Sequence, residues 1–173
     1  MKSSATPRLP GIDLTGTGSC GSFNLRRSAR AVTSFFDSAF QDCGIRSTQF
    51  TILVGIAKTQ PTPIGALADL LAIDRTTLTR SLRLLKKEGL LTVSDRSTKR
   101  QRFLKLTSKG ERLLKRSLPA WRKAQHRFVE ALGTDYWAHL RKELETLARL
   151  ALSLEFREKR DHLGADPNPR FLK

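Results

Sequence analysis

The stretch from Thr62 to Gly110 decides the fold and reads TPIGALADLLAIDRTTLTRSLRLLKKEGLLTVSDRSTKRQRFLKLTSKG. It contains two short runs with helical spacing of apolar residues, followed by two runs that alternate as strands do. The segment between the two strand-like runs is rich in cations. This order predicts a pair of packed helices and a β-hairpin with a basic tip.

Capping signals locate the two short helices. Thr62 followed by Pro63 predicts the start of the first one, because Thr can accept a hydrogen bond from a free amide and Pro loses nothing at the first helical position. Asp74 is expected to cap the second helix. The apolar faces that would pack these helices together are formed by Ile64, Leu67, Ala68 and Leu71, and by Leu78, Leu82 and Leu85.

Arginines and threonines occupy the other face of the second helix. Arg can donate two hydrogen bonds to guanine, and a small Thr lets the backbone approach a phosphate or a thymine methyl group. On an arbitrary helix such residues more often form a solvated charged face, but the preceding helix and the following hairpin favour DNA recognition here. The expected contact residues are Arg75, Thr76, Thr79, Arg80 and Arg83.

The hairpin is expected to form from Leu90, Leu91 and Val93 and from the alternating run Arg102 to Leu106, with the tip D-R-S-T-K-R between them. A cationic tip can enter a minor groove, whose narrow channel concentrates negative potential. A plain solvated loop is the alternative. The candidate contacts are Arg96, Lys99 and Arg100. Together these features predict a winged helix-turn-helix domain that binds duplex DNA over residues 47–106.

Composition agrees with a nucleic-acid partner. The 173 residues suit one well-packed domain, and 32 Lys and Arg against 16 Asp and Glu leave a net charge of +16. No apolar run has the length of a membrane span and no signal peptide is recognisable, so a cytoplasmic location without membrane contact is expected. We expect no enzyme activity, metal or cofactor, because no nucleophile–base pair, phosphate-binding glycine loop or metal-ligand spacing is found.

The flanking sequence predicts long helices and two flexible ends. Residues 1–22 are rich in Gly, Pro, Ser and Thr and predict a flexible arm. A first helix is expected from Asn24 to Gly44, and a second from Ser47 to just before Pro61. Residues 158–173 resemble a loose tail.

Two further helices are expected after the hairpin. Thr107 can cap a long one in which Pro119 predicts a kink near residues 115–117. The last helix carries an apolar seam at steps of three and four residues, formed by Leu140, Leu144, Leu147, Ala151 and Leu154. Such a seam can meet a partner helix or pack within its own chain. The fold class is therefore mainly α with a small β-hairpin wing, and residues 23–46 and 107–157 are assigned to a helical dimerisation region.

The sequence resembles the MarR family of winged-helix transcription regulators from about Asn24 to Glu155. The segment LTRSLRLLKKEGLL, the later K-R pair and then LTSKG carry the resemblance. It implies that Thr79 and Arg80 face the major groove and that Arg100 enters the minor groove. The family's acidic residue two positions before that arginine is replaced here by Thr98, with Asp95 as a candidate substitute.

The resemblance also implies a function. Family members dimerise through the first, fifth and sixth helices, so a homodimeric repressor on a pseudo-palindromic site with half-sites about 10 bp apart is expected. A small aromatic or phenolic ligand between these helices and the winged domain would lower DNA affinity. The candidate lining residues are Arg30, Phe36, Phe40, Phe50, Trp121 and His126, although ordinary core aromatics and solvated cations are the alternative for each.

Two other mechanisms remain open. Peroxide-sensing relatives carry a reactive cysteine near the start of the first helix; the matching position is Ser22 here, and Cys20 lies two residues earlier. Arg26 and Phe36 stand where the thiolate-binding tyrosines are expected, so Cys20 is a redox candidate, while Cys43 is expected to be a small buried apolar residue. A non-specific nucleoid-type DNA-binding protein would share the basic composition but would not need a reading helix.

Overall fold

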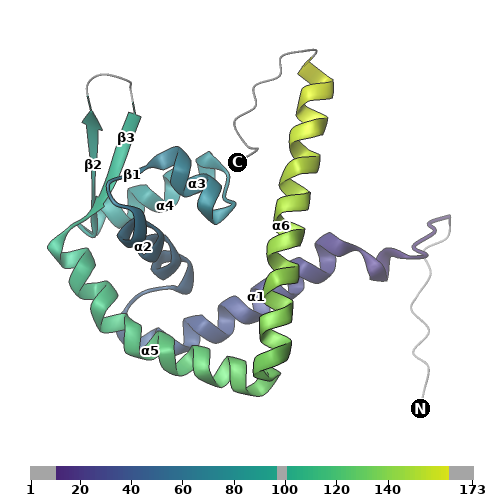
Figure 1. The fold of residues 1–173 in the computed structure, drawn as a ribbon, viewed down its shortest axis with the longest axis horizontal. Coiled ribbons are helices and arrows are strands. Elements are labelled where there is room, and N and C mark those ends of the chain that lie inside the picture. The colour runs from purple at the N-terminus through teal and green to yellow at the C-terminus, as the bar shows by residue number, and fades with distance from the viewer. Residues whose placement is uncertain (1–10, 97–100, 164–173) are drawn as a thin grey trace.

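The computed structural model describes residues 11–96 and 101–163, and it describes side chains over 11–94 and 102–154. The chain is mainly helical with one small antiparallel sheet, as the sequence predicted (Figure 1). The helices are α1 (Gly21–Ala39), α2 (Ser47–Thr59), α3 (Ile64–Leu71), α4 (Arg75–Lys87), α5 (Ser108–Leu132) and α6 (Thr134–Leu163), and 3-10 turns span Thr17–Ser19 and Gln41–Cys43. None of the described helices is both long and apolar enough to cross a membrane.

The sheet has the strand order β1-β3-β2, with β1 (Thr62–Pro63), β2 (Leu91–Arg96) and β3 (Gln101–Leu106). The two long strands form the predicted hairpin, in register from the Leu91–Leu106 pair to the Arg96–Gln101 pair. The assignment of Thr62 as a helix cap is wrong. Thr62 is a buried strand residue opposite Leu104, and α3 begins after it with no side-chain cap.

The core lies inside the winged domain, where α2, α3 and α4 pack around the sheet. Its centre is formed by side chains that are almost wholly buried, namely Leu53, Ile56, Leu67, Leu78, Leu85, Leu91 and Leu104. The predicted apolar face of α4 is confirmed, since Leu78, Leu82 and Leu85 are all buried. At about 25 cal/mol per Å² of apolar surface removed from water, this packing is what holds α4 in place.

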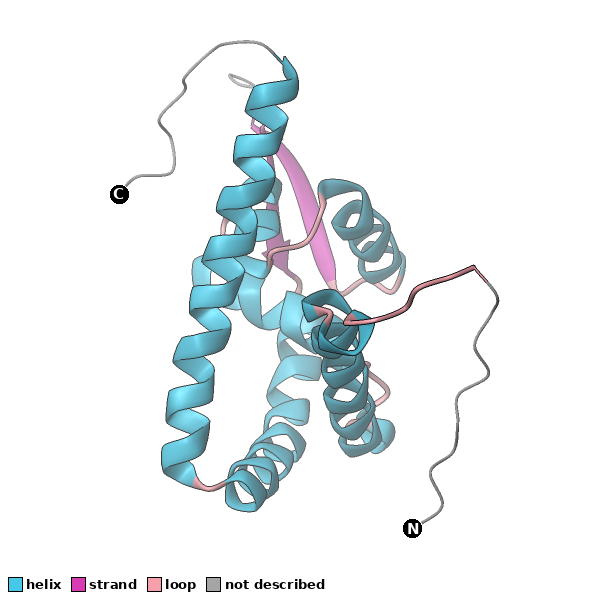
Figure 2. Ribbon diagram, turned by 90° about the vertical axis from the view of Figure 1, so that its right-hand side faces the viewer, coloured by secondary structure: helices cyan, strands magenta, loops and turns pink. Residues whose placement is uncertain are grey.

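The long helices frame this domain. Figure 1 shows α5 leading away from the base of the hairpin, α1 crossing beneath α2, and α6 returning as a separate rod. Figure 2 shows α6 as one long helix that runs along the height of the molecule. The helix α1 begins at Gly21, before the predicted start at Asn24 and inside the predicted arm. The helix α5 is continuous through Pro119 and is visibly bent, and Ser117 Oγ donates to the Leu113 carbonyl at 2.9 Å close to the proline.

Candidate functional site

Helix α4 is positioned by its cap and by the turn before it. The Asp74 carboxylate accepts a hydrogen bond from the Thr77 amide at 2.9 Å, which confirms the predicted cap. Hydrogen bonds from Thr77 hold the pKa of Asp74 below its ordinary value. In the turn, Ala72 adopts a left-handed conformation with φ of 49°, and the Ile73 amide donates to the Ala68 carbonyl at 3.0 Å. The turn therefore fixes α4 against α3.

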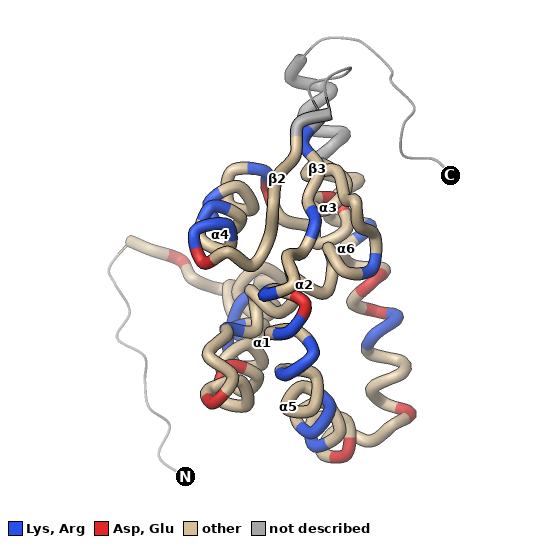
Figure 3. Tube along the Cα trace, turned by 90° about the vertical axis from the view of Figure 1, so that its left-hand side faces the viewer, with Lys and Arg blue, Asp and Glu red and all other residues tan. Residues whose placement is uncertain are grey.

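The predicted reading residues lie on the outward side of α4. Arg75, Arg80 and Arg83 are exposed, as is Thr76, while Thr79 is half-buried and its hydroxyl donates to the Arg75 carbonyl at 2.6 Å. Figure 3 shows the Lys and Arg positions along this helix. The face is therefore free to enter a groove while the opposite face is anchored in the core.

The structure describes the strands of the wing but not its tip. Arg96 is the last residue of β2, but its side chain is not described. Lys99 and Arg100 lie outside the described residues, as does Thr98. The substitution of Asp95 for the family's acidic residue stays a prediction, because the side chain of Asp95 is also not described.

A dense junction joins α4, the wing and α5. The Thr107 hydroxyl accepts from the Gly110 amide at 3.1 Å, which confirms the predicted α5 cap, and it donates to the Gly89 carbonyl at 2.7 Å. Lys109 Nζ donates to the Glu88 carbonyl at 2.7 Å. Gly110 packs so closely on the backbone of Leu90 that a Cβ there would overlap the Leu90 carbonyl. The LTSKG segment thus closes the end of α4 onto α5, a role that the sequence signals alone did not reveal.

An apolar pocket of about 480 Å³ lies between α1, α2 and α5. Its walls include the four aromatic residues predicted to line a ligand pocket, Phe36, Phe40, Phe50 and Trp121. The rings of Phe40 and Phe50 are 4.7 Å apart, and Phe50 stacks on Trp121 at 6.2 Å. Lys58 also lines the pocket and is a cation that the sequence reasoning did not select.

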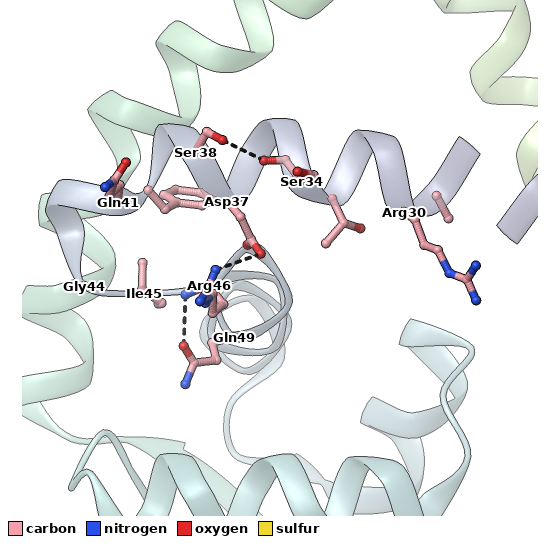
Figure 4. Close-up of a pocket in the computed structure, with 12 residues that line it drawn as sticks. Arg30, Ser34, Asp37, Ser38, Gln41, Gly44, Ile45, Arg46 and Gln49 are labelled. Atoms are coloured by element: carbon pink, nitrogen blue, oxygen red, sulfur yellow. Dashed lines mark hydrogen bonds and ion pairs between the residues drawn. The ribbon is translucent and has the colours of Figure 1, made fainter. Parts of the chain in front are cut away.

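The two polar residues predicted with these aromatics do not line this pocket. Arg30 lines a larger cavity of about 860 Å³, shown in Figure 4. Thr33 and Phe40 line both spaces, so the two cavities flank α1. His126 is exposed and lies 3.7 Å from Glu130 of its own helix, away from both cavities.

Asp37 links α1 to α2 inside the larger cavity. Its carboxylate accepts from the Ser47 amide at 2.7 Å and lies 3.5 Å from Nη1 of Arg46. The Ser47 hydrogen bond, aided by the Arg46 charge, holds the pKa of Asp37 below its ordinary value. Because Ser47 is the first residue of α2, a side chain of α1 satisfies one of the free amides at the start of α2.

The two cysteines lie in different surroundings. Cys20 is exposed immediately before α1. Cys43 packs against the core as expected of a small apolar residue, but it is half-buried rather than buried. Among the described residues, no group of His, Cys, Asp and Glu has the arrangement of a metal site.

A helix pair with a basic outward face, followed by a hairpin wing, defines a winged helix-turn-helix DNA-binding protein. Residues 45–100 match the model of the MarR family. The chain is 30% identical to the M. tuberculosis transcriptional regulator MosR in complex with DNA, over 78% of this chain and 98% of that one, with a TM-score of 0.72. The chain belongs to the MarR family and is a DNA-binding transcription regulator.

Two more distant structures share the fold. Bordetella bronchiseptica BpsR, whose DNA binding is regulated by 6-hydroxynicotinic acid, is 20% identical over 76% of this chain and 96% of its own, with a TM-score of 0.66. Rhodococcus jostii CouR bound to p-coumaroyl-CoA is 18% identical over 78% and 95%, with a TM-score of 0.64. No curated protein matches the chain.

Proposed function

We propose that the protein is a sequence-specific repressor that binds a pseudo-palindromic operator as a homodimer. The observation that carries the proposal is the outward face of α4, where exposed arginines stand over a fully anchored apolar face. Such a face can donate hydrogen bonds to base edges while the helix keeps its register. Arg96, Lys99 and Arg100 of the wing are proposed to contact the adjacent minor groove. We also propose a cytoplasmic location, where a DNA-binding regulator has access to its operator.

Exposed apolar side chains support the homodimer. Large apolar residues on α1 and α6 face solvent in the single chain, among them Phe23, Leu25, Leu144, Leu147, Leu150 and Leu154. Contiguous exposed apolar surface on a soluble chain marks an association surface. A two-fold dimer through these helices would present two α4 helices to half-sites about 10 bp apart.

We further propose that a small aromatic acid binds in the 480 Å³ pocket and lowers DNA affinity. The stacked aromatic walls suit a planar ring, and Lys58 can pair with a carboxylate. Aromatic ligands named for BpsR and CouR, which share the fold, agree with this class. Arg30 would meet a ligand only if it extended into the neighbouring cavity.

The DNA proposal is tested by selecting bound sites from random duplexes and then comparing wild type with Arg80→Ala. We expect the variant to lose about 1–3 kcal/mol on the selected site and to relax preference at one base pair. Arg141→Ala, an exposed residue of α6, is the charge-matched control. Equal losses on selected and random duplexes at matched salt would contradict base reading and would favour the nucleoid-type alternative.

The ligand proposal is tested by titrating a panel of aromatic acids against the DNA complex. We expect release by a subset of these acids, with Lys58→Gln weakening the response to the acid more than to its neutral amide. Release that is unaffected by both Lys58→Gln and Trp121→Ala would place the ligand elsewhere.

A further inference from the structure

The outer face of α5 carries five cations that the proposed operator contact does not use. They form two groups separated by Pro119, and spacings of three, four and seven residues place both groups on one side of the helix. All are exposed, and they are Arg112, Lys115, Arg116, Arg122 and Lys123. We call this set the α5 basic face.

The opposite side of α5 is already occupied. Gly110, Ser117 and Ala124 are buried, and Leu113, Leu114 and Leu118 pack against the core. The helix therefore cannot rotate to hide the basic face. The arrangement is fixed by the same packing that holds α5 to the winged domain.

The charges of the basic face are not neutralised within the described part of the chain. No described carboxylate lies within ion-pair distance of any of its five members. The nearby acids of the same helix stand at its two ends, where Glu130 lies beside His126 and Glu111 is in the first turn. Burying these cations in an apolar dimer contact would carry a large desolvation cost, so the face is expected to stay open in the dimer.

The basic face is separate from the reading helix. Figure 1 shows α5 leading away from the hairpin, and Figure 3 shows the Lys and Arg positions of α5 apart from those of α4. From Arg112 to Lys123 the face is about 16 Å long, which corresponds to about five base-pair steps of duplex. A duplex held by α4 would not lie along this surface.

We propose that the α5 basic face binds the phosphate backbone of a second DNA duplex, so that one dimer can hold two DNA segments together. The face contains cations and no large apolar side chain. Protein partners are normally anchored by aromatic or other large apolar side chains, whereas phosphate binding needs only Lys and Arg. A membrane surface is disfavoured because the apolar side of α5 is occupied by the core and cannot insert.

The test measures capture of a second duplex by the full-length protein. An immobilised duplex that carries a site selected from random DNA is loaded with protein, and retention of a fluorescent duplex without that site is recorded over a range of salt concentrations. The test variant combines Arg112→Gln, Arg116→Gln and Lys123→Gln. The control removes the same charge from exposed positions of α6 through Arg141→Gln, Lys142→Gln and Arg149→Gln.

We expect wild type and the control variant to retain the second duplex. The α5 variant should retain at least tenfold less of the second duplex than wild type does. The α5 variant should still bind the immobilised duplex through α4. The salt slope for the second duplex should fall by up to about 2.7 per protomer, since each lost phosphate contact removes about 0.9. Circular dichroism and gel filtration verify that each variant is folded and dimeric.

Three results would overturn the proposal. Wild type could fail to retain a second duplex, the α5 variant could retain it as wild type does, or both triple variants could lose it equally. The last outcome would show an effect of net charge alone. None of these results would affect the sequence preference of α4, which the selection experiment measures separately.

Discussion

Gly110→Ala is expected to destabilise the protein, although alanine normally favours helices. Gly110 lies in the first turn of α5, where a Cβ would overlap the carbonyl of Leu90. That carbonyl already accepts a hydrogen bond from the Thr107 amide at 3.1 Å, and Leu90 is itself buried. The new methyl group would therefore meet a backbone carbonyl that is fixed by a hydrogen bond and by burial. This carbonyl can move only if the junction between α4, the wing and α5 opens.

The magnitude follows from two opposing terms. Replacing Gly by Ala inside a helix gains about 0.5–1 kcal/mol. Forcing an extra methyl group into a closely packed site costs about 1–3 kcal/mol, with the upper end expected where backbone must shift. At the upper end of that cost, the net loss should be about 2 kcal/mol of unfolding free energy.

Two other helical glycines provide matched controls for the same substitution. At Gly65 a Cβ would lie 3.4 Å from Nη2 of Arg75, a flexible side-chain end, so Gly65→Ala should be neutral or should gain up to about 1 kcal/mol. At Gly55 it would lie 2.8 Å from Cδ1 of Leu67, a buried side chain that can partly adjust, so an intermediate effect is expected. The predicted order of stability is Gly65→Ala, then Gly55→Ala, then Gly110→Ala.

Urea unfolding followed by circular dichroism measures this order. All variants must be compared at one protein concentration, because association with a second chain would shift the apparent stability. A change in midpoint with an unchanged slope would identify a stability effect. The reasoning would be refuted if Gly110→Ala were as stable as wild type or matched Gly65→Ala.

Three further outcomes are expected. Thr107→Ala should lose about 1 kcal/mol of unfolding free energy through the lost α5 cap, whereas Thr107→Ser should retain most of it; equal losses would show that the hydroxyl is not the cause. Because the folded-state pKa of Asp37 is lowered, its stabilisation is present above the ordinary value of 3.8 and disappears as pH falls through the folded-state pKa. Acid unfolding curves should therefore show a smaller loss below that pH in Asp37→Asn than in wild type, and parallel curves would contradict this assignment. Peroxide should affect DNA binding equally in wild type and Cys20→Ser if an aromatic ligand is the signal; release from wild type alone would instead establish the redox alternative.

Local signals predicted α4 because its determinants lie within the helix. Asp74 caps it and the leucines at three- and four-residue steps anchor it, so neither feature depends on distant sequence. Thr62 carried an equally good local capping signal and was misassigned. Its place is set by pairing with Leu104 of β3, and such long-range pairing leaves no trace in the neighbouring residues.

The same distinction applies to the pocket. Phe36, Phe40 and Phe50 could be grouped because aromatic residues at helical spacing face the interior of a helical domain. The rotation of α1 about its axis decides which cavity a polar residue of that helix lines. The sequence periodicity did not show that Arg30 lines the larger cavity rather than the aromatic pocket. Lys58 was not predicted to line the pocket because it lies at the end of a helix that is otherwise apolar.

The position of α1 explains how an occupied pocket could alter DNA reading. Thr33 of α1 and Phe40, which caps the C-terminal end of α1, border both cavities. Asp37 of α1 accepts a hydrogen bond from the first amide of α2. A ligand that displaces α1 must either break this hydrogen bond or carry the start of α2 with it. Because α2 packs against α3 and the sheet, its movement would displace the elements against which α4 packs. In a two-fold dimer the spacing of the two α4 helices must match the spacing of the half-sites. A small displacement of α2 in each protomer would therefore weaken the DNA contacts of both α4 helices at once.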